Sequence, residues 1–253
     1  MHLFDLIIAL FAALTAGFIN AVAGGGTLVT FPVLLALGFP PLAANVTNTV
    51  ALVPGYTGGI YAQRKDFAAQ KKRLFAILPL SILGGIAGGL ILLNTAEKAF
   101  NGIVPYLIFL ACFLLAIQVP VKKWMQSRSG HTHSTLIKRS LAGLMLFLAS
   151  VYGGYFGAGV SVIVIAILGL IYDDSLTSLN VLKQAISFSI NISAAIYFAF
   201  SGKVDWNFAV VMMFGAINGG LIGGKFVGRI KTGMLRWIVI VVGCTAAFIY
   251  LLK

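Results

Sequence analysis

Long apolar runs separated by short polar connections extend along almost the whole chain. The runs lack the alternation of period two that marks a β-strand, so they predict helices rather than strands. Most of them are close to the roughly 20 residues that a helix needs to cross the hydrocarbon core of a bilayer. The pattern therefore predicts an all-α polytopic membrane protein. We expect the apolar segments at 3–22, 27–38, 42–62, 74–93, 103–119, 140–156, 160–172, 179–200, 208–224 and 235–252.

Composition agrees with this pattern. Of the 253 residues, 60% are hydrophobic and only 9% are charged, whereas about a quarter of the residues of a soluble domain are charged. The formal net charge of +12 comes from lysines and arginines in the short loops between apolar runs. Such loops follow the positive-inside rule of membrane proteins, so we expect a lipid bilayer as the partner and no nucleic acid. The predicted location is the cell (inner) membrane.

Four short motifs of the first half of the chain recur in the second half in the same order. Glycine pairs arise independently where membrane helices approach closely, but four ordered repeats at nearly constant spacing favour a duplication. The repeated pairs are Gly84-Gly85 and Gly219-Gly220, Gly24-Gly25-Gly26 and Gly157-Ala158-Gly159, Asp66-Phe67 and Asp205-Trp206, and Asn45-Val46 and Asn180-Val181. We predict a first transmembrane half over 1–119, a cytoplasmic linker over 120–139 and a second half over 140–253.

The second half is predicted to be inverted relative to the first. Segment 27–38 would be only about 18 Å long as a helix, which is too short to cross the membrane. We therefore interpret 27–38 and 160–172 as the second members of broken or re-entrant helix pairs, and three transmembrane helices follow each pair. Whether the short segments cross fully stays open. This model places 14 of the 18 basic residues in or beside loops 63–73, 120–139 and 225–236, all on the cytoplasmic face.

The glycine breaks are candidate anion sites. Inverted-repeat transporters bind substrates near the bilayer midplane, where interrupted helices expose backbone groups. Gly24, Gly25 and Gly26 precede a helical segment for which Thr27 is the expected N-cap, and the N–H groups at a helix N-terminus favour an anion. Gly157 and Gly159 flank the corresponding break in the second half. The alternative interpretation is a kink that serves only helix packing.

Polar residues inside the apolar runs are the other candidates for a binding site. Lys183 is the only basic residue well inside a predicted span, where facing lipid would cost about 2.5–3.5 kcal/mol. The alternative is that Lys183 extends to the nearby interface. Without an acidic residue deep in any span, a cavity lined by these groups suits an anion. The polar candidates are Asn20, Asn45, Thr47, Asn48, Asn180, Lys183, Gln184 and Asn191.

Several of these motifs resemble the sulfite exporter TauE/SafE family of membrane permeases. The similar stretches are Ala23-Gly24-Gly25-Gly26-Thr27, Pro40-Pro41-Leu42-Ala43-Ala44-Asn45-Val46-Thr47-Asn48, Tyr155-Phe156-Gly157-Ala158-Gly159, Asn180-Val181-Leu182-Lys183-Gln184 and Gly202-Lys203-Val204-Asp205-Trp206. The resemblance covers nearly the whole chain, and it adds Tyr155 to the candidate site residues. It implies transport of small anions such as sulfite, organosulfonates or carboxylates.

Three classes of function compete. A secondary transporter that works by alternating access around a midplane site is the leading hypothesis, and a passive anion channel is the alternative. An enzyme would need paired catalytic groups within the spans, whereas the histidines lie near the N-terminus and in the linker. We expect no catalytic residue, no cofactor and no metal, and we expect His131 and His133 to be solvated. The substrate, the direction of transport, the coupling ion and a homo-oligomeric state are left open.

Overall fold

The structure is a computed structural model that describes residues 3–62, 67, 70–127, 136–172, 174, 176–226 and 232–252. Within these residues the chain forms ten helices and no strand, which confirms the all-helical prediction. The helices are α1 (Leu3–Val22), α2 (Thr27–Ala36), α3 (Pro41–Ala62), α5 (Lys71–Asn94), α6 (Glu97–Ser127), α7 (Leu136–Tyr155), α8 (Val160–Ile171), α9 (Leu176–Ala199), α10 (Trp206–Phe226) and α11 (Thr232–Leu251).

Six of these helices are long and apolar enough to cross a membrane, namely α1, α5, α6, α9, α10 and α11. By contrast, α2 has only ten residues, so it is about 15 Å long, half of a typical hydrocarbon core. The helix bounds follow the predicted apolar segments closely, with one clear difference. The predicted linker 120–139 is helical at both of its ends, because α6 continues to Ser127 and α7 begins at Leu136.

The end of α2 illustrates how local sequence sets these bounds. Gly38 has φ +89°, a left-handed conformation that glycine adopts without a Cβ clash. Its N–H bonds to the carbonyl of Leu35, and the N–H of Phe39 bonds to the carbonyl of Leu34. These two bonds form a Schellman motif, which satisfies the last carbonyls of the helix. Pro41 then opens α3 at the first helical position, where its missing N–H costs nothing.

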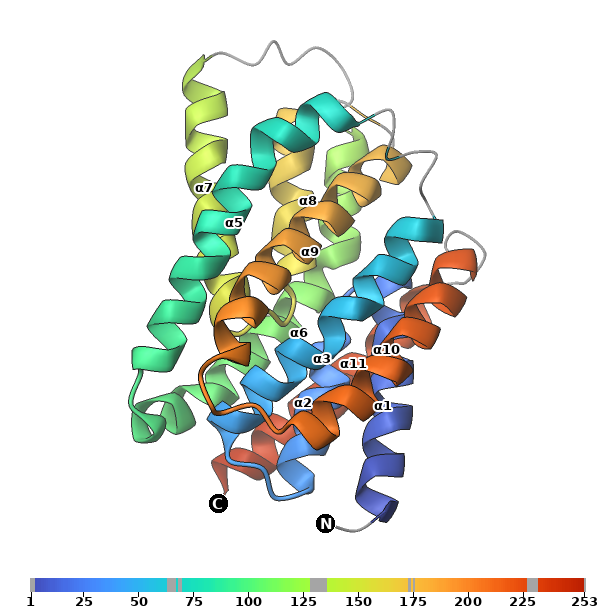
Figure 1. Cartoon of the computed structure of the whole chain (residues 1–253). Coiled ribbons are helices and arrows are strands. Elements are labelled where there is room, and N and C mark those ends of the chain that lie inside the picture. The colour runs from blue at the N-terminus through green and yellow to red at the C-terminus, as the bar shows by residue number, and fades with distance from the viewer. Residues whose placement is uncertain are drawn as a thin grey trace.

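The central helices are α3 and α9, which pack against each other (Figure 1). Buried residues make up 78% of the most apolar stretch of α9, whereas they make up only 28% of the corresponding stretch in α1 and in α11. The alignment that pairs Asn45 with Asn180 also pairs the first residues of the two central helices, Pro41 and Leu176. Most of the polar residues predicted for the site therefore lie on helices that are largely shielded from lipid.

Repeated glycines allow the helices around this centre to pack closely. In α10, a Cβ on Gly219 would lie 1.9 Å from the carbonyl oxygen of Leu14 in α1. In α5, a Cβ on Gly88 would lie 2.0 Å from the carbonyl oxygen of Val151 in α7. Both separations are impossible for a real Cβ, so only glycine fits. Small residues at such interfaces are typical of membrane helices, because they let two backbones approach closely.

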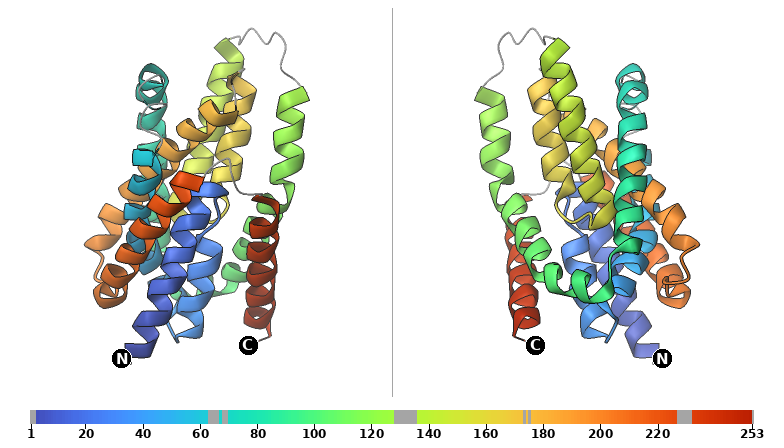
Figure 2. Two further views of the ribbon diagram at one scale, coloured as in Figure 1. Left: turned by 90° about the vertical axis from the view of Figure 1, so that its right-hand side faces the viewer. Right: turned by 90° about the vertical axis from the view of Figure 1, so that its left-hand side faces the viewer.

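The contacting helices form two corresponding sets. The contacts of α1 with α10, of α3 with α10 and of α1 with α2 are matched by those of α7 with α5, of α9 with α5 and of α7 with α8. In Figure 1, α1 and α10 begin in the lower half, whereas α5 and α7 begin at the top. Both ends of the chain lie at the bottom, and Figure 2 shows the same from two sides.

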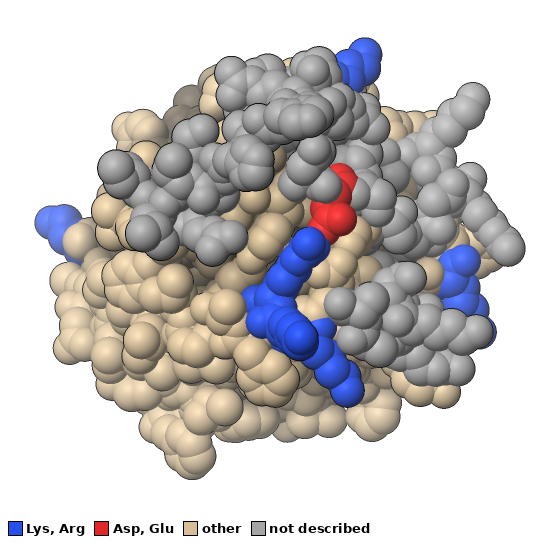
Figure 3. Space-filling view, turned by 90° about the horizontal axis from the view of Figure 1, so that it is seen from above, with Lys and Arg blue, Asp and Glu red and all other residues tan. Residues whose placement is uncertain are grey.

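Positive charge gathers at the upper end of the molecule. Lys71, Lys72 and Arg73 open α5 there, and Lys225 lies in the last turn of α10. Seen from above, blue basic side chains lie beside one red carboxylate (Figure 3). Residues 63–66, 68–69, 128–135 and 227–231, which hold the rest of several basic loops and both linker histidines, lie outside the described residues.

Candidate functional site

The two glycine breaks connect α1 to α2 and α7 to α8. Their glycines take left-handed backbone angles that other residues adopt rarely: φ is +83° at Gly24, +95° at Gly25, +79° at Gly157 and +77° at Gly159. The prediction that Thr27 is the N-cap of α2 is wrong. Gly26 holds that position and Thr27 is the first helical residue.

Asn20 explains this difference at the first break. Its side-chain oxygen accepts a hydrogen bond from the N–H of Gly26 at 2.8 Å, so a residue of α1 satisfies one of the N–H groups at the start of α2 that lack an intrahelical partner. A Cβ on Gly26 would lie 2.3 Å from the carbonyl oxygen of Ala16. The capping oxygen therefore comes from the preceding helix, where a search for Ser, Thr or Asp next to the helix start does not find it.

The breaks still offer unbonded backbone donors. In the first break, the N–H groups of Ala23, Gly24 and Gly26 are hydrogen-bonded. Among the residues that the structure describes, the N–H groups of Gly25 and Thr27 donate no hydrogen bond. The same holds for Ala158, which is the middle residue of the second break as Gly25 is of the first. Each break thus has a backbone N–H that can donate a hydrogen bond to a small anion.

The two breaks lie against each other although they belong to different halves of the chain. A Cβ on Gly24 would lie 3.0 Å from the Cβ of Ser161, at the start of α8. The rings of Phe31 and Phe156 meet edge to face, with their centroids 5.3 Å apart. The middle of α6 adjoins both breaks, because Gly25 faces Leu115 and Gly159 faces Ala111.

The first central helix contributes buried amides to this region. The side-chain nitrogen of Asn45 donates to the carbonyl of Tyr155, the last residue of α7, at 2.9 Å. The side-chain oxygen of Asn45 and both polar atoms of Asn48 are buried without a hydrogen-bond partner among the described residues. Burying an unpaired polar atom costs about 1–3 kcal/mol. A bound ligand that completed these hydrogen bonds would remove that cost. Thr47 instead accepts from the N–H of Asp205 at 3.0 Å.

The second central helix carries the other predicted residues. Asn191 donates to the carbonyl of Ser187 at 2.8 Å and lies 3.5 Å from the hydroxyl of Tyr56 in α3. Its side-chain oxygen lies 3.6 Å from where a Cβ on Gly157 would be. Lys183 and Gln184 are only 2% and 1% exposed. Asn180, one turn before Lys183, is half-buried.

Three residues at the breaks were missed from the sequence. The side-chain nitrogen of Gln118 in α6 donates to the carbonyl of Ala23 at 3.0 Å, and the Tyr152 hydroxyl donates to the carbonyl of Ala158 at 2.6 Å. Tyr56 joins α3 to Asn191. Gln118 carried a usable signal, because a polar residue inside an apolar span seldom faces lipid. The two tyrosines carried none, since tyrosine is common at membrane interfaces.

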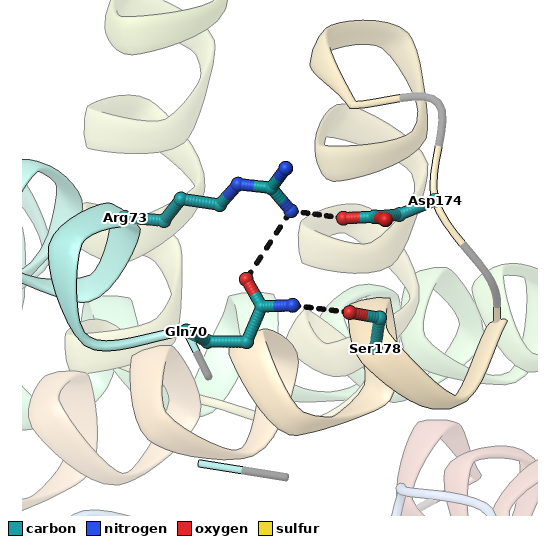
Figure 4. A network of polar contacts seen from close by, with 4 residues as sticks. All are labelled: Gln70, Arg73, Asp174 and Ser178. Carbon is teal, nitrogen blue, oxygen red and sulfur yellow. Dashed lines mark hydrogen bonds and ion pairs between the residues drawn. The ribbon is translucent and has the colours of Figure 1, made fainter. Parts of the chain in front are cut away.

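Two further contacts join the halves of the chain at opposite ends. The lower contact consists of Phe39, between α2 and α3, and Phe208 in α10, whose ring centroids lie 4.8 Å apart. The upper contact consists of Gln70 and Arg73 at the start of α5, Asp174 between α8 and α9, and Ser178 at the start of α9 (Figure 4). Among the described residues, no group of three or more metal-binding side chains is present.

Comparisons with known proteins agree on one family. Residues 9–250 match the family model described as sulfite exporter TauE/SafE. The chain is 29% identical to a protein named "Probable membrane transporter protein" from Haemophilus influenzae, over 97% of this chain and 95% of that one. It is 26% identical to the "Probable membrane transporter protein ORF9" of a Sinorhizobium species, over 96% and 92% of the two chains. YfcA of Escherichia coli K12, also named a probable membrane transporter protein, is 24% identical, over 92% and 84%.

Proposed function

Because the chain belongs to the sulfite exporter TauE/SafE family of membrane transporters, we propose that it is a secondary transporter of small anions. The observation that carries the proposal is the meeting of the two glycine breaks between buried polar side chains of α3 and α9. The proposed substrates are sulfur-containing anions such as sulfite or an organosulfonate, or small carboxylates. The protein is a multi-pass membrane protein.

The chemistry of the described groups favours an anion over a cation. Unbonded hydrogen-bond donors lie at the breaks, namely the N–H groups of Gly25, Thr27 and Ala158. The side-chain nitrogen of Asn48, on the helix whose Asn45 bonds to Tyr155, is a further buried donor without a described partner. Each of the four described acidic residues lies in the first turn of a helix or in a connection. No described carboxylate would therefore repel an anion from the middle of the membrane.

We further propose that the halves are inverted repeats. The matching contacts of the two sets of helices support this arrangement. So does direction: α1 and α10 run upward in Figure 1, while α7 and α5 run downward. Alternating access then consists of rocking one set of helices against the other around the breaks, so that the site opens first to one face and then to the other.

The proposed symmetry gives Lys183 a place in the site. Asn45 bonds to Tyr155. Asn180 corresponds to Asn45 in the Asn-Val repeat, and aligning the two glycine breaks makes Val22 correspond to Tyr155. Asn180 would then lie at the end of α1, and Lys183, one turn further along α9, would lie beside the first break. A lysine there supplies a compact positive charge, while the amides and backbone N–H groups orient the anion.

Transport by purified protein in liposomes tests the proposal. We expect saturable uptake of at least one of sulfite, thiosulfate, sulfoacetate and simple carboxylates, and acceleration of that uptake when the liposomes are loaded with the same anion. Such counterflow requires alternating access. Saturable uptake without counterflow would instead favour the passive anion channel. Absence of uptake for every tested anion, in vesicles shown to contain folded protein, would refute the proposal.

A further inference from the structure

The upper contact holds an arginine whose guanidinium is only partly used. One terminal nitrogen of Arg73, Nη1, donates both to the carboxylate of Asp174 and to the side-chain oxygen of Gln70, the latter at 3.2 Å. The guanidinium also lies over the ring of Tyr172, 4.6 Å from its centroid. Gln70 in turn donates to the hydroxyl of Ser178. Three of these four contacts tie the start of α5 to the connection between α8 and α9 or to the first turn of α9.

The other side of the guanidinium is available to a ligand. Within the described part of the chain, Nε and Nη2 of Arg73 make no hydrogen bond, and Figure 4 shows the second terminal nitrogen turned away from Asp174 and Gln70. The side chain is 40% exposed. A guanidinium presents a planar set of donors that matches the oxygen atoms of a carboxylate, and it binds tetrahedral oxyanions in the same way.

The contact lies at the upper end of α9, just before the buried part of that helix. Ser178 precedes Lys183 by five residues, which is about 7.5 Å along a helix axis. Gln70 is 8% exposed and Lys183 only 2% exposed. An anion that moves from the upper surface toward Lys183 along α9 therefore meets Arg73 before it meets the buried lysine.

We propose that Arg73 is an entry subsite for oxyanions and that Asp174 is a resident carboxylate, which an incoming anion displaces. Displacement releases Asp174 from Arg73, and the bound anion then neutralises the positive charge of the guanidinium above Lys183. This inference rests on the proposed function, because it assumes an anionic substrate. It assigns to Arg73 the selection of anions at the upper end, which is separate from binding at the glycine breaks.

The strength of the ion pair suits this exchange. With side-chain exposures of 40% for Arg73 and 27% for Asp174, the pair belongs with surface ion pairs, which contribute little to stability and are weakened by salt. A dissolved oxyanion can therefore compete with the carboxylate of Asp174. A fully buried pair would resist such exchange, because separating its charges would leave them without solvent.

Charged thiol reagents test the subsite. In protein that carries Cys112→Ala and Cys244→Ala, Gln184→Cys places one thiol directly after Lys183 on α9. The labelling rates by a sulfonate-bearing and by a trimethylammonium-bearing methanethiosulfonate are compared in nanodiscs, where both faces are accessible. We expect Asp174→Asn to raise the ratio of anionic to cationic labelling at least threefold and Arg73→Gln to lower it at least threefold. Lys72→Gln, which removes an exposed neighbouring charge, should leave the ratio within twofold.

Sulfoacetate supplies a second arm of the test. At constant ionic strength, sulfoacetate at about 10 mM should accelerate labelling by the cationic reagent at least twofold when Arg73 and Asp174 are both present, and should have no effect in Arg73→Gln. Equal labelling ratios in Arg73→Gln and Lys72→Gln would overturn the inference. Labelling does not require transport, so an Arg73-dependent ratio in a protein that transports none of the screened anions would refute the proposed function and leave the entry subsite intact.

Discussion

The two ends of the molecule carry different kinds of side-chain contact at positions that the internal alignment makes equivalent. At the upper end Arg73 of α5 pairs with Asp174, and at the lower end Phe208 of α10 packs on Phe39. The alignment that pairs the two Asn-Val motifs also pairs Arg73 with Phe208 and Phe39 with Asp174. An ion pair and an aromatic pair therefore occupy equivalent places in the two halves. In the repeat that we propose, the two halves share a backbone arrangement but differ in charge at these places.

The central helices differ in the same way. The same alignment pairs Asn48 of α3 with Lys183 of α9, and both residues are buried. One half offers an amide at this place and the other a cation. A transporter with two identical halves would present the same groups to both faces. In the transport that we propose, these differences give the upper end of the molecule the charge that attracts an anion.

The first prediction tests whether the two ends lie on opposite faces of the membrane. Single cysteines at the exposed positions Lys72, Lys98 and Lys225, in protein without Cys112 and Cys244, should react with an impermeant thiol reagent in an all-or-none manner. In right-side-out vesicles we expect Lys98→Cys to react and Lys72→Cys and Lys225→Cys to stay unlabelled. The positive-inside rule predicts this orientation. If the cysteines at positions 72 and 225 reacted from opposite faces, the inverted arrangement would be wrong.

The second prediction concerns a bulky side chain in the first glycine break. Gly25→Leu should abolish transport while the protein still folds and inserts, because φ is +95° there and the new Cβ would lie 2.8 Å from Cδ1 of Leu115. Gly202→Leu is the matched control, since Gly202 also has a positive φ of +71° but has open space around it. Uptake into liposomes, normalised to the amount of folded protein, is measured for both variants, and we expect only Gly25→Leu to lose it. Normal uptake by Gly25→Leu would exclude close approach of an anion to this break.

The third prediction sharpens the contrast between the central helices. Lys183→Met keeps the length of the side chain but removes its charge, and we expect the anion affinity to fall at least tenfold, which corresponds to about 1.4 kcal/mol. Lys203→Met, in the connection between α9 and α10, should change the affinity less than twofold. Competition for uptake over a range of anion concentrations measures both. Equal effects of the two substitutions would mean that Lys183 is a structural lysine.

The smallest expected effect concerns stability at the two ends. Phe208 is 5% exposed, so Phe208→Ala should lower the free energy of unfolding by about 3 kcal/mol, as a large-to-small change in a core does. Arg73→Ala removes a partly exposed ion pair and should cost about 1 kcal/mol or less. Thermal unfolding in the same detergent compares the two variants. A larger loss for Arg73→Ala would show that the upper contact is a structural clamp rather than an exchangeable pair.

The helices and their breaks could be predicted from the sequence because they depend on local features. An apolar run of about 20 residues specifies a membrane-spanning helix, and the glycines at 24–26, 157 and 159 interrupt such runs. The prediction also recognised that 27–38 was too short to cross. It placed the ends of α6 and α7 too far apart, because the long polar stretch 120–139 suggested a linker although polar and charged residues also occupy helix ends.

The site itself was only partly predictable, since its contacts join distant parts of the chain. The bond from Asn45 to Tyr155 spans 110 residues, and the bond from Gln118 to Ala23 spans 95. A composition-based argument can list polar residues inside apolar runs, but it cannot say which of them meet. Thr27 is a second example. Its residue type favours the N-cap position of α2, but Gly26 holds that position and its N–H bonds to Asn20 of the preceding helix.

The contact between α1 and α10 has a consequence for how the chain is made. Helix α1 leaves the ribosome well before α10, yet it packs its Leu14 and Phe18 against Gly219 and Gly223 of that helix. At about 5–20 residues per second, α1 waits roughly 10–40 s for this partner. During that interval lipid, the insertion machinery or another newly made chain must cover the surface that α10 later takes. Assembly of this fold therefore waits for α10, and neither half can complete its packing before the other has been made.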